Sequence, residues 1–257
     1  MAVKPYNPES YWDQVAHEIG SRRELKLIAG DDEPYYRYKR AKFLQLLNRL
    51  DVTGKTVLEV GSGPGGNLDV LSRKGAGALY GADVSQRMIA LSRRLLQGRG
   101  VEIRKTNGTS LPFEDRFFDL VFTSTVLQHN THEESLRGLI TEICRVSRSE
   151  VVIFERIEPV VKGHDSNLGR PVSYYAALFR EQGFELRETR FLHIQASYVV
   201  CGLIRKLFNP RSRREGESLT SFSLWLQRVL LPLTRILDRW VPGKRDLGML
   251  HFTRPAS

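Results

Sequence analysis

Four glycines, with an acid before them and an acid after them, carry the clearest chemical signal in this chain. Glu59 lies in the apolar run Thr56–Val60, the glycines fall between Gly61 and Gly66, and Asp83 follows at the spacing expected of an acid that holds a ribose. Glycine lacks a Cβ atom, so a turn built from it lets a ligand approach the backbone closely. An apolar run, a glycine turn and a helical apolar pattern together predict a strand–turn–helix unit that binds a nucleotide.

The glycine spacing fits two kinds of nucleotide cofactor. Gly61, Gly63 and Gly66 match G-x-G-x-x-G, the dinucleotide pattern, which favours NAD as much as any other ligand. Glu59 with Gly61, Gly63 and Gly65 matches Glu-x-Gly-x-Gly-x-Gly equally well. The methionine end of S-adenosylmethionine (SAM) is a zwitterion, and an acid near the loop would suit its ammonium group. The loop alone leaves both cofactors open.

Polar side chains follow several predicted strands at the point where each strand ends. Glu59, Asp83, Asn107 and Thr123 lie at or just after such ends. Ligands of parallel sheets bind outside the carboxyl ends of the strands, where the strand order reverses. The expected strands span 56–60, 78–82, 101–105, 118–123, 150–156, 184–194 and 247–253, with helices at 85–96, 133–147 and 172–182 between them. This alternation predicts an α/β fold, with a mostly parallel seven-stranded sheet and helices on both faces.

Three regions are expected along the chain. Residues 1–50 form an N-terminal helical lid or cap, although their aromatic residues are equally compatible with ordinary core packing. Residues 51–195 form the nucleotide-binding core. Residues 196–257 form a basic helical appendage plus the last strand, and residues 219–240 of the appendage form a helix pair or a helix kinked at Pro232. From residue 201 onward the appendage holds eleven Lys or Arg against four acids.

Composition sets broad limits on the protein class. The chain has 257 residues, a hydrophobic fraction of 41%, a net charge of +10 and a pI of about 9.8. This balance permits attraction to nucleic acid, anionic lipid or phosphorylated substrates. Cys144 and Cys201 have no metal-like spacing, so we expect two reduced core thiols and no metal site. With no secretory signal and no apolar run of about 18 residues, a cytoplasmic protein is expected, peripheral at most to the inner face of the membrane.

The segment 106–122, TNGTSLPFEDRFFDLVF, decides between the cofactors. It resembles the part of class I (Rossmann-like) SAM-dependent methyltransferases in which an acidic residue precedes a Leu-Pro-Phe turn and a Phe-Asp-x-Val strand. The glycine loop, the Asp83–Ser85 step with Met88, and the segment 125–129 (TVLQH) resemble the same family. The likeness is to its type 11-like branch, which acts on small molecules and glycans, and it covers residues 57–129.

The resemblance implies a role for each matching position. Asp83 would accept the ribose hydroxyls, Glu59 would lie near the methionine end, and Val84 and Met88 would pack on adenine. Asn107 would meet the adenine edge, where the family commonly has an acid; its amide oxygen still offers an acceptor. The full set implied to contact SAM, and its product S-adenosylhomocysteine, is Glu59, Gly61, Ser62, Gly63, Asp83, Val84, Met88, Asn107, Gly108 and Thr123.

Catalytic and substrate residues are less marked in the sequence. His129 follows the fourth strand, and two roles remain open for it: a general base, which its ordinary pKa near 6.5 would suit, or a wall of the pocket. Tyr11, Arg156, Arg170 and Tyr174 are candidates for contact with the acceptor.

The expected activity is transfer of a methyl group from SAM to a hydroxyl or amine of a small-molecule or glycan acceptor, which could be linked to a lipid. The basic appendage could touch an anionic membrane. An RNA or protein methyltransferase is the alternative favoured by net charge, but the sequence holds no RNA-binding pattern with interleaved aromatics. A non-catalytic SAM-binding module is the third possibility, and a nicotinamide oxidoreductase a distant fourth.

Overall fold

The computed structural model describes residues 7–20, 33–210, 212–213, 217–243 and 246–255. Parts of the expected N-terminal lid, residues 1–6 and 21–32, lie outside these ranges. So do residues 211, 214–216 and 244–245, which belong to the basic clusters of the appendage.

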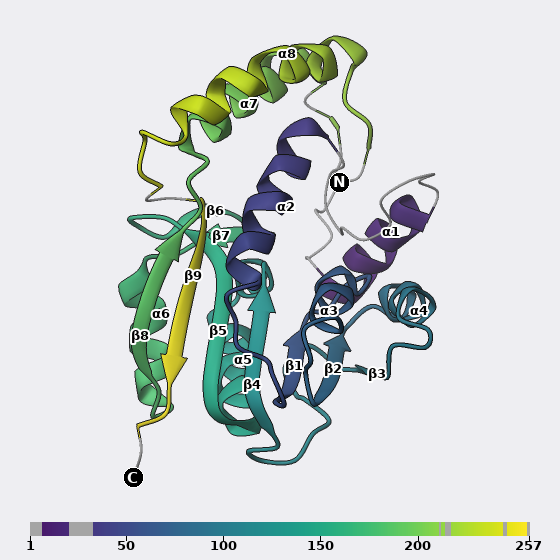
Figure 1. Ribbon diagram of the computed structural model, residues 1–257, viewed down its shortest axis with the longest axis vertical. Helices are drawn as coiled ribbons and strands as arrows, with labels where there is room; N and C mark the ends of the chain where they lie inside the picture. Colours follow the sequence, from purple (N-terminus) through teal and green to yellow (C-terminus); the bar gives the residue numbers. More distant parts are fainter. Residues whose placement is uncertain (1–6, 21–32, 211, 214–216, 244–245, 256–257) are drawn as a thin grey trace, which may run out of the picture.

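A single seven-stranded sheet organises the described residues, as the sequence predicted (Figure 1). The strand order is β3-β2-β1-β4-β5-β9-β8. β9 runs antiparallel to both of its neighbours, whereas β1 to β5 pair in parallel. The strands are β1 (Thr56–Val60), β2 (Ala78–Asp83), β3 (Val101–Lys105), β4 (Phe118–Ser124), β5 (Ser147–Ile157), β8 (Glu185–Phe191) and β9 (Asp246–Thr253).

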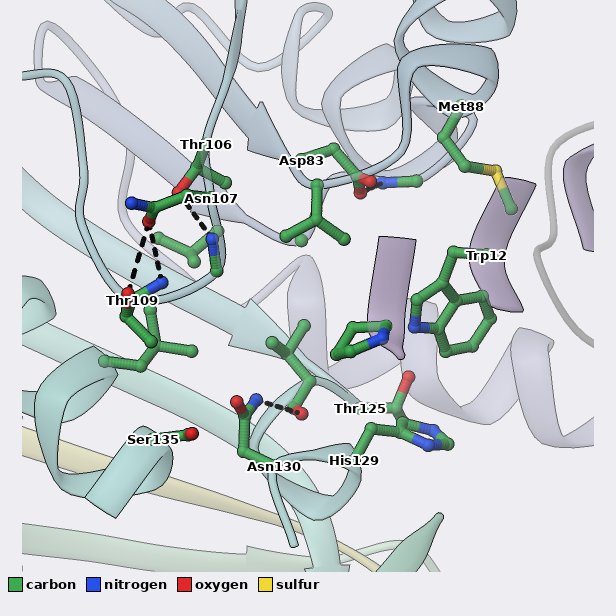
Figure 2. Close-up of a pocket in the computed structure, with 18 of the residues that line it drawn as sticks. Trp12, Asp83, Met88, Thr106, Asn107, Thr109, Thr125, His129, Asn130 and Ser135 are labelled. Atoms are coloured by element: carbon green, nitrogen blue, oxygen red, sulfur yellow. Dashed lines mark hydrogen bonds between the residues drawn. The ribbon is translucent and has the colours of Figure 1, made fainter. Parts of the chain in front are cut away.

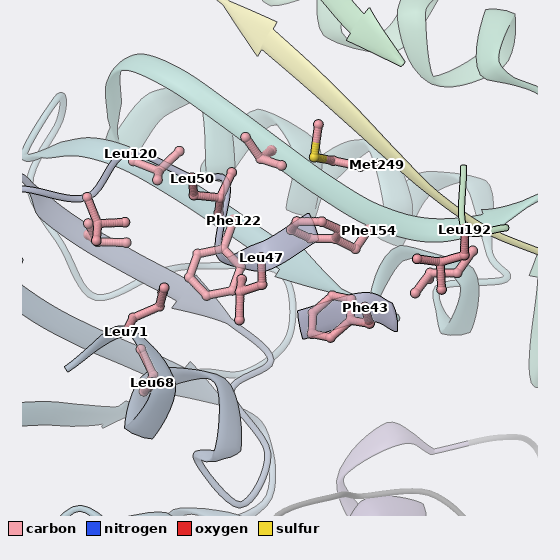
Figure 3. Packing of buried hydrophobic residues seen from close by; sticks show 14 of the residues in the cluster. Phe43, Leu47, Leu50, Leu68, Leu71, Leu120, Phe122, Phe154, Leu192 and Met249 are labelled. Atoms are coloured by element: carbon pink, nitrogen blue, oxygen red, sulfur yellow. The ribbon is translucent and has the colours of Figure 1, made fainter. Parts of the chain in front are cut away.

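Helices cover both faces of the sheet because successive strand residues alternate between two apolar cores. One face packs against α2 (Pro34–Leu47), α3 (Gly66–Leu71) and α4 (Gln86–Leu95), and the other against α5 (Glu133–Val146) and α6 (Val172–Glu181). Figure 3 shows the first core, where Phe43 of α2 meets Phe154 of β5 edge to face at 5.0 Å between ring centroids. Cys144 and Cys201 are buried and free.

Several boundaries differ from the sequence prediction. The strand predicted over 184–194 ends at Phe191, because Ile194 already caps the helix α7 (Gln195–Phe208). The segment 219–240 contains one helix, α8 (Ser221–Leu237), with Pro232 inside it, and α8 packs beside α7. A short hairpin, β6 (Lys162–His164) with β7 (Asn167–Gly169), was not predicted, because its polar and mostly exposed residues show no alternation.

The N-terminal helix α1 (Pro8–Gly20) is attached to the start of α4. The Asp13 carboxylate accepts hydrogen bonds from Ser85 Oγ at 2.5 Å and from the backbone N–H of Arg87 at 3.2 Å. Val15, Ala16 and Ile19 pack in one apolar cluster with Met88. This attachment holds the first turns of α1 near the carboxyl ends of the central strands.

Replacing Phe43 by Ala should lower the free energy of unfolding by about 3–5 kcal/mol, because it empties the ring-sized contact between α2 and the sheet. Urea unfolding measures the change. Phe117→Ala is the control, since that ring is 38% exposed and its removal should cost much less. Equal losses in the two variants would show that α2 is not anchored by this contact.

Candidate functional site

A pocket opens at the carboxyl ends of β1, β2 and β4, where the strand order reverses between β1 and β4. This is the position at which open α/β sheets bind ligands. It encloses about 270 Å³, close to the size of a small-ligand site. Figure 2 shows the pocket. Its lining consists of Pro8, Trp12, Val60, Gly61, Gly63, Asp83, Val84, Met88, Thr106, Asn107, Gly108, Thr109, Ser124, Thr125, Val126, His129, Asn130, Ser135 and Leu139.

The glycine turn forms one wall of the pocket. It requires glycine at Gly61 because a Cβ atom there would clash with a neighbouring side chain. Gly61 has φ +71°, and a Cβ atom on it would lie 2.2 Å from Cγ2 of Val126. Gly63 and Gly65 also have positive φ, and Gly65 begins α3. The turn folds back on β2, since the N–H groups of Gly61 and Ser62 both donate to the Ala82 carbonyl. The backbone of the turn is therefore exposed to a ligand on the pocket side.

Asp83 ends β2 and lines the pocket. Its Oδ2 accepts from the Gly63 N–H and its Oδ1 from the Ser85 N–H, both at 2.8 Å. Burial raises its pKa, while these backbone hydrogen bonds act in the opposite direction. Each carboxylate oxygen keeps a further lone pair, so the group can still accept two hydroxyls from a ligand.

Val84, Met88, Asn107 and Gly108 lie on the pocket wall beside Asp83. The Asn107 side chain plays a different part from the one expected. Its Oδ1 accepts from the N–H groups of Thr109 at 3.0 Å and Ser110 at 2.8 Å, which closes the loop on itself. The amide oxygen expected to accept a hydrogen bond from adenine is thus bound to backbone N–H groups of its own turn.

Glu59, Ser62 and Thr123 lie behind the lining rather than in it. Glu59 accepts from Asn67 Nδ2 at 2.6 Å, and burial raises its pKa to about 8. Its Oε2 has no hydrogen-bond partner among the described residues. Thr123 donates to Glu155 at 2.9 Å, and the next residues, Ser124 and Thr125, reach the pocket instead.

His129 lies opposite the glycine turn, and its ring meets that of Trp12 edge to face at 5.1 Å (Figure 2). Nδ1 is 2.7 Å from the Ser166 carbonyl, which can only accept, so Nδ1 carries the proton. Nε2 is then the unprotonated nitrogen, 3.3 Å from Gln128 Nε2. Burial lowers the pKa of His129 to about 4. The imidazole is therefore neutral at neutral pH.

Two buried charged groups hold the turn that carries His129. The Glu155 carboxylate accepts from the N–H groups of Val126, Leu127 and Gln128, each at 3.0 Å. From the other side, the Arg170 guanidinium donates to the Leu127 carbonyl at 3.0 Å and to the Asn130 carbonyl at 2.7 Å. The turn is a short 3-10 helix, Leu127–His129, and these two side chains bind backbone groups that its own hydrogen bonds leave over.

The residues proposed from the sequence to touch the acceptor do not line the pocket. Arg170 is fully buried under the His129 turn, and Arg156 pairs with Glu158 at 3.0 Å. Tyr174 donates to Glu133, and Tyr11 stacks edge to face on Trp12. Sequence reasoning missed Pro8, Trp12, Thr125 and Asn130 as lining residues, and it missed the supporting role of Glu155. Of these lining residues, Trp12 could have been found as an aromatic residue of the region expected to be a lid. No cluster of metal-ligating side chains is found in the described ranges.

A mostly parallel sheet with an antiparallel β9 and a pocket at its switch point define a Rossmann-like α/β fold with a ligand site at the usual place. The family comparison gives the particular class. Residues 58–154 match the family model described as a methyltransferase domain, of type 11. Residues 58–154 therefore form a SAM-dependent methyltransferase domain with the class I fold.

Similar proteins carry the same description. The chain is 25% identical to the uncharacterized methyltransferase YdaC of Bacillus subtilis over 163 residues, which are 62% of this chain and 88% of that protein. It is 33% identical over 113 residues to a fatty-acid O-methyltransferase of Mycolicibacterium smegmatis, covering 44% of this chain and 40% of that protein. The fold resembles the SAM-bound magnesium protoporphyrin IX methyltransferase of Synechocystis, with a TM-score of 0.60, 14% identity, and coverage of 96% and 95%.

The pocket residues fit SAM. Asp83 offers a buried carboxylate to ribose hydroxyls, and Val84 and Met88 offer an apolar wall to a purine. The glycine turn and Thr125, whose φ is +58°, offer backbone groups to a polar amino-acid end. Bound SAM supplies a methyl group on a positively charged sulfur.

Replacing Asp83 by Asn should weaken SAM binding about 5- to 150-fold, or about 1–3 kcal/mol, because one acceptor oxygen and the charge are lost. Isothermal titration calorimetry measures the affinity, and circular dichroism checks that the variant folds. Asp115→Asn, at a largely exposed position, is the matched control. An unchanged affinity in the Asp83 variant would remove Asp83 from the cofactor site.

Replacing Glu155 by Gln should lower the free energy of unfolding by about 1–3 kcal/mol, because an amide N–H would then face the backbone N–H groups that the carboxylate accepts. Urea unfolding measures it. Glu150→Gln on the same strand is the control: its partly exposed pair with Lys55, in which the side chains are 23% and 26% exposed, should contribute about 0–1 kcal/mol. Equal effects would mean that Glu155 does not hold the turn.

Proposed function

We propose that the chain transfers the methyl group of SAM to a hydroxyl or amine of a small-molecule or glycan acceptor, including one carried on a lipid, and releases S-adenosylhomocysteine. The observation that carries the proposal is the chemistry of the lining beside His129. Among the described residues that line the pocket, none is a Lys or Arg, and Asp83 and His129 are the ionisable ones. A neutral acceptor group fits such a wall.

The same lining argues against an anionic acceptor at the reaction centre. Nucleic-acid enzymes hold phosphates with Lys and Arg close to the reacting base. Here the groups around His129 are Trp12, Thr125, Val126 and Asn130, which offer apolar surface and neutral hydrogen-bonding groups. This supports a hydroxyl or a neutral amine.

His129 is proposed to act through Nε2, the unprotonated nitrogen. A group with a pKa of about 4 is a weak base, but it can accept a hydrogen bond from an acceptor hydroxyl and so orient it. An oxygen that gains a methyl group becomes strongly acidic, so a weak base suffices to take its proton. The His129 ring would then fill both roles that the sequence left open, as a base and as a wall of the pocket.

The helix α1 is proposed to act as a lid over the acceptor side. Pro8 and Trp12 line the pocket, and the Trp12 ring meets His129. The similarity to a fatty-acid O-methyltransferase supports an acceptor with apolar parts, which would pack against such an aromatic wall.

The proposal is tested with methyl-labelled SAM added to an extract of the source cell, which is then separated into small-molecule, lipid, RNA and protein fractions. We expect label in the small-molecule or lipid fraction. The Asp83→Asn protein, which should bind SAM weakly, is the control for background. Label confined to RNA or protein would overturn the proposed acceptor class, and intact SAM binding without transfer to any fraction would favour a binding module.

The pH dependence of kcat should report the lowered pKa of His129. Because the imidazole is already neutral above a pH of about 4, kcat should stay level between about pH 6 and pH 8 and fall only as the pH approaches 4. His129→Leu should lower kcat, while the Kd for SAM changes little. A kcat that declines below an apparent pKa of about 6.5 would contradict this assignment.

A further inference from the structure

The helical hairpin of α7 and α8 is inverted relative to an ordinary surface helix. In α8 the buried residues include Ser223, Gln227 and Thr234, whereas large apolar side chains face outward. Trp225 is 54% exposed and Leu233 is 60% exposed. A water-exposed helix normally turns its apolar stripe toward the core.

The two helices are joined to the protein and to each other through polar contacts. Ser197 Oγ of α7 donates to the Asp238 carboxylate at 2.5 Å and lies 2.8 Å from the Thr234 hydroxyl. Asp238 also accepts from Tyr38 of α2 at 3.1 Å, and Gln227 accepts from the N–H of Tyr35 at 3.2 Å. The inward side of the hairpin thus combines these polar contacts with the buried Cys201, Ile204 and Leu231, while most of its large apolar side chains are left outward.

The outward apolar residues form one stripe along each helix, and we call the two stripes together the hairpin face. They recur every three or four residues, as expected for one side of a helix. The hairpin face consists of Val199, Leu203 and Leu207 of α7 with Phe222, Trp225, Val229, Leu233, Ile236 and Leu237 of α8, and Trp240 just beyond it. Contiguous apolar surface of this extent on a soluble protein marks an interaction site.

The charges around the hairpin face indicate an anionic lipid surface. Neither α7 nor α8 contains an Asp or Glu, while they carry Lys206, Arg228 and Arg235 as well as Arg205, which pairs with the buried Glu33. Asp238, which follows α8, is buried. A second copy of the chain on this face would bring cations against cations, whereas an anionic leaflet complements them.

The aromatic residues and the helix lengths fit a position in the membrane interface. Tryptophan favours the boundary between headgroups and acyl chains, and Trp225 and Trp240 both belong to the hairpin face. No helix in the described part of the chain has the length and apolar content to cross a bilayer. Such a helix lies in the plane of the interface with its apolar side immersed.

We propose that the hairpin face of α7 and α8 inserts into the interfacial layer of an anionic lipid bilayer and docks the protein there. The hairpin lies beyond the end of the sheet toward which the parallel strands point, the same end as the pocket (Figure 1). Docking thus brings the pocket end of the molecule toward the membrane. The use of this geometry for a lipid-linked acceptor rests on the proposed function; the docking itself does not.

Co-sedimentation of the full chain with vesicles tests the proposal. We expect binding to vesicles of phosphatidylcholine and phosphatidylglycerol, weaker binding to phosphatidylcholine alone, and a blue shift of tryptophan fluorescence on binding. The double variant Val229→Ser/Leu233→Ser should lower the partition coefficient about tenfold or more, because two exposed aliphatic side chains are lost from the inserted face. Arg228→Glu should reduce the preference for anionic vesicles.

The matched control is Val160→Ser/Val161→Ser, which removes two exposed valines outside the α7–α8 hairpin. It should bind vesicles as the unchanged protein does. SAM affinity should be the same in all variants, so that loss of docking is distinguished from failure of the methyltransferase assignment.

Absence of vesicle binding by the unchanged protein would overturn the proposal, as would equal binding by both double variants. A dimer in analytical ultracentrifugation that the Val229→Ser/Leu233→Ser change dissociates, without vesicle binding, would assign the face to a second copy instead.

Discussion

The buried carboxylate of Glu155 and the buried guanidinium of Arg170 are the contacts on which the pocket most depends. A turn in a protein interior needs partners for its backbone groups, and these two side chains bind those of the segment 126–130 that its own 3-10 hydrogen bonds do not use. The turn places Val126 against Gly61 and His129 against Trp12. The cofactor wall and the acceptor wall are therefore both set by one small polar assembly.

A second polar chain links the N-terminal helices to the cofactor loop. Arg40 of α2 donates to Asn67 of α3, and Asn67 in turn donates to Glu59 of β1. On its other side, α2 receives the hairpin through Tyr35 and Tyr38. The helix α2 thus contacts both Asn67, beside the glycine turn, and the inner side of the α7–α8 hairpin. These contacts fix the orientation of the hairpin relative to the pocket.

The sequence predicted the sheet well because its strands are buried apolar runs separated by amphipathic helices, a pattern fixed by the two cores. That Gly61 and Asp83 line the pocket could be predicted for the same reason, because both lie at strand ends that the local sequence pattern marks. The functions of Arg170 and Trp12 could not be found, since both depend on which distant segments meet. Arg170 reaches a turn about forty residues earlier, and no local pattern distinguishes such an arginine from one that binds substrate.

The roles assigned to Asp83 and His129 both depend on where the cofactor's ribose and sulfur lie in this pocket. A crystal structure with S-adenosylhomocysteine bound tests it most directly. We expect both ribose hydroxyls within hydrogen-bond distance of the Asp83 carboxylate, adenine between Val84 and Met88, and the sulfur facing the side of the pocket that Trp12 and His129 line. A ribose held by another group, or a sulfur turned away from His129, would contradict both the cofactor site and the placement of the acceptor.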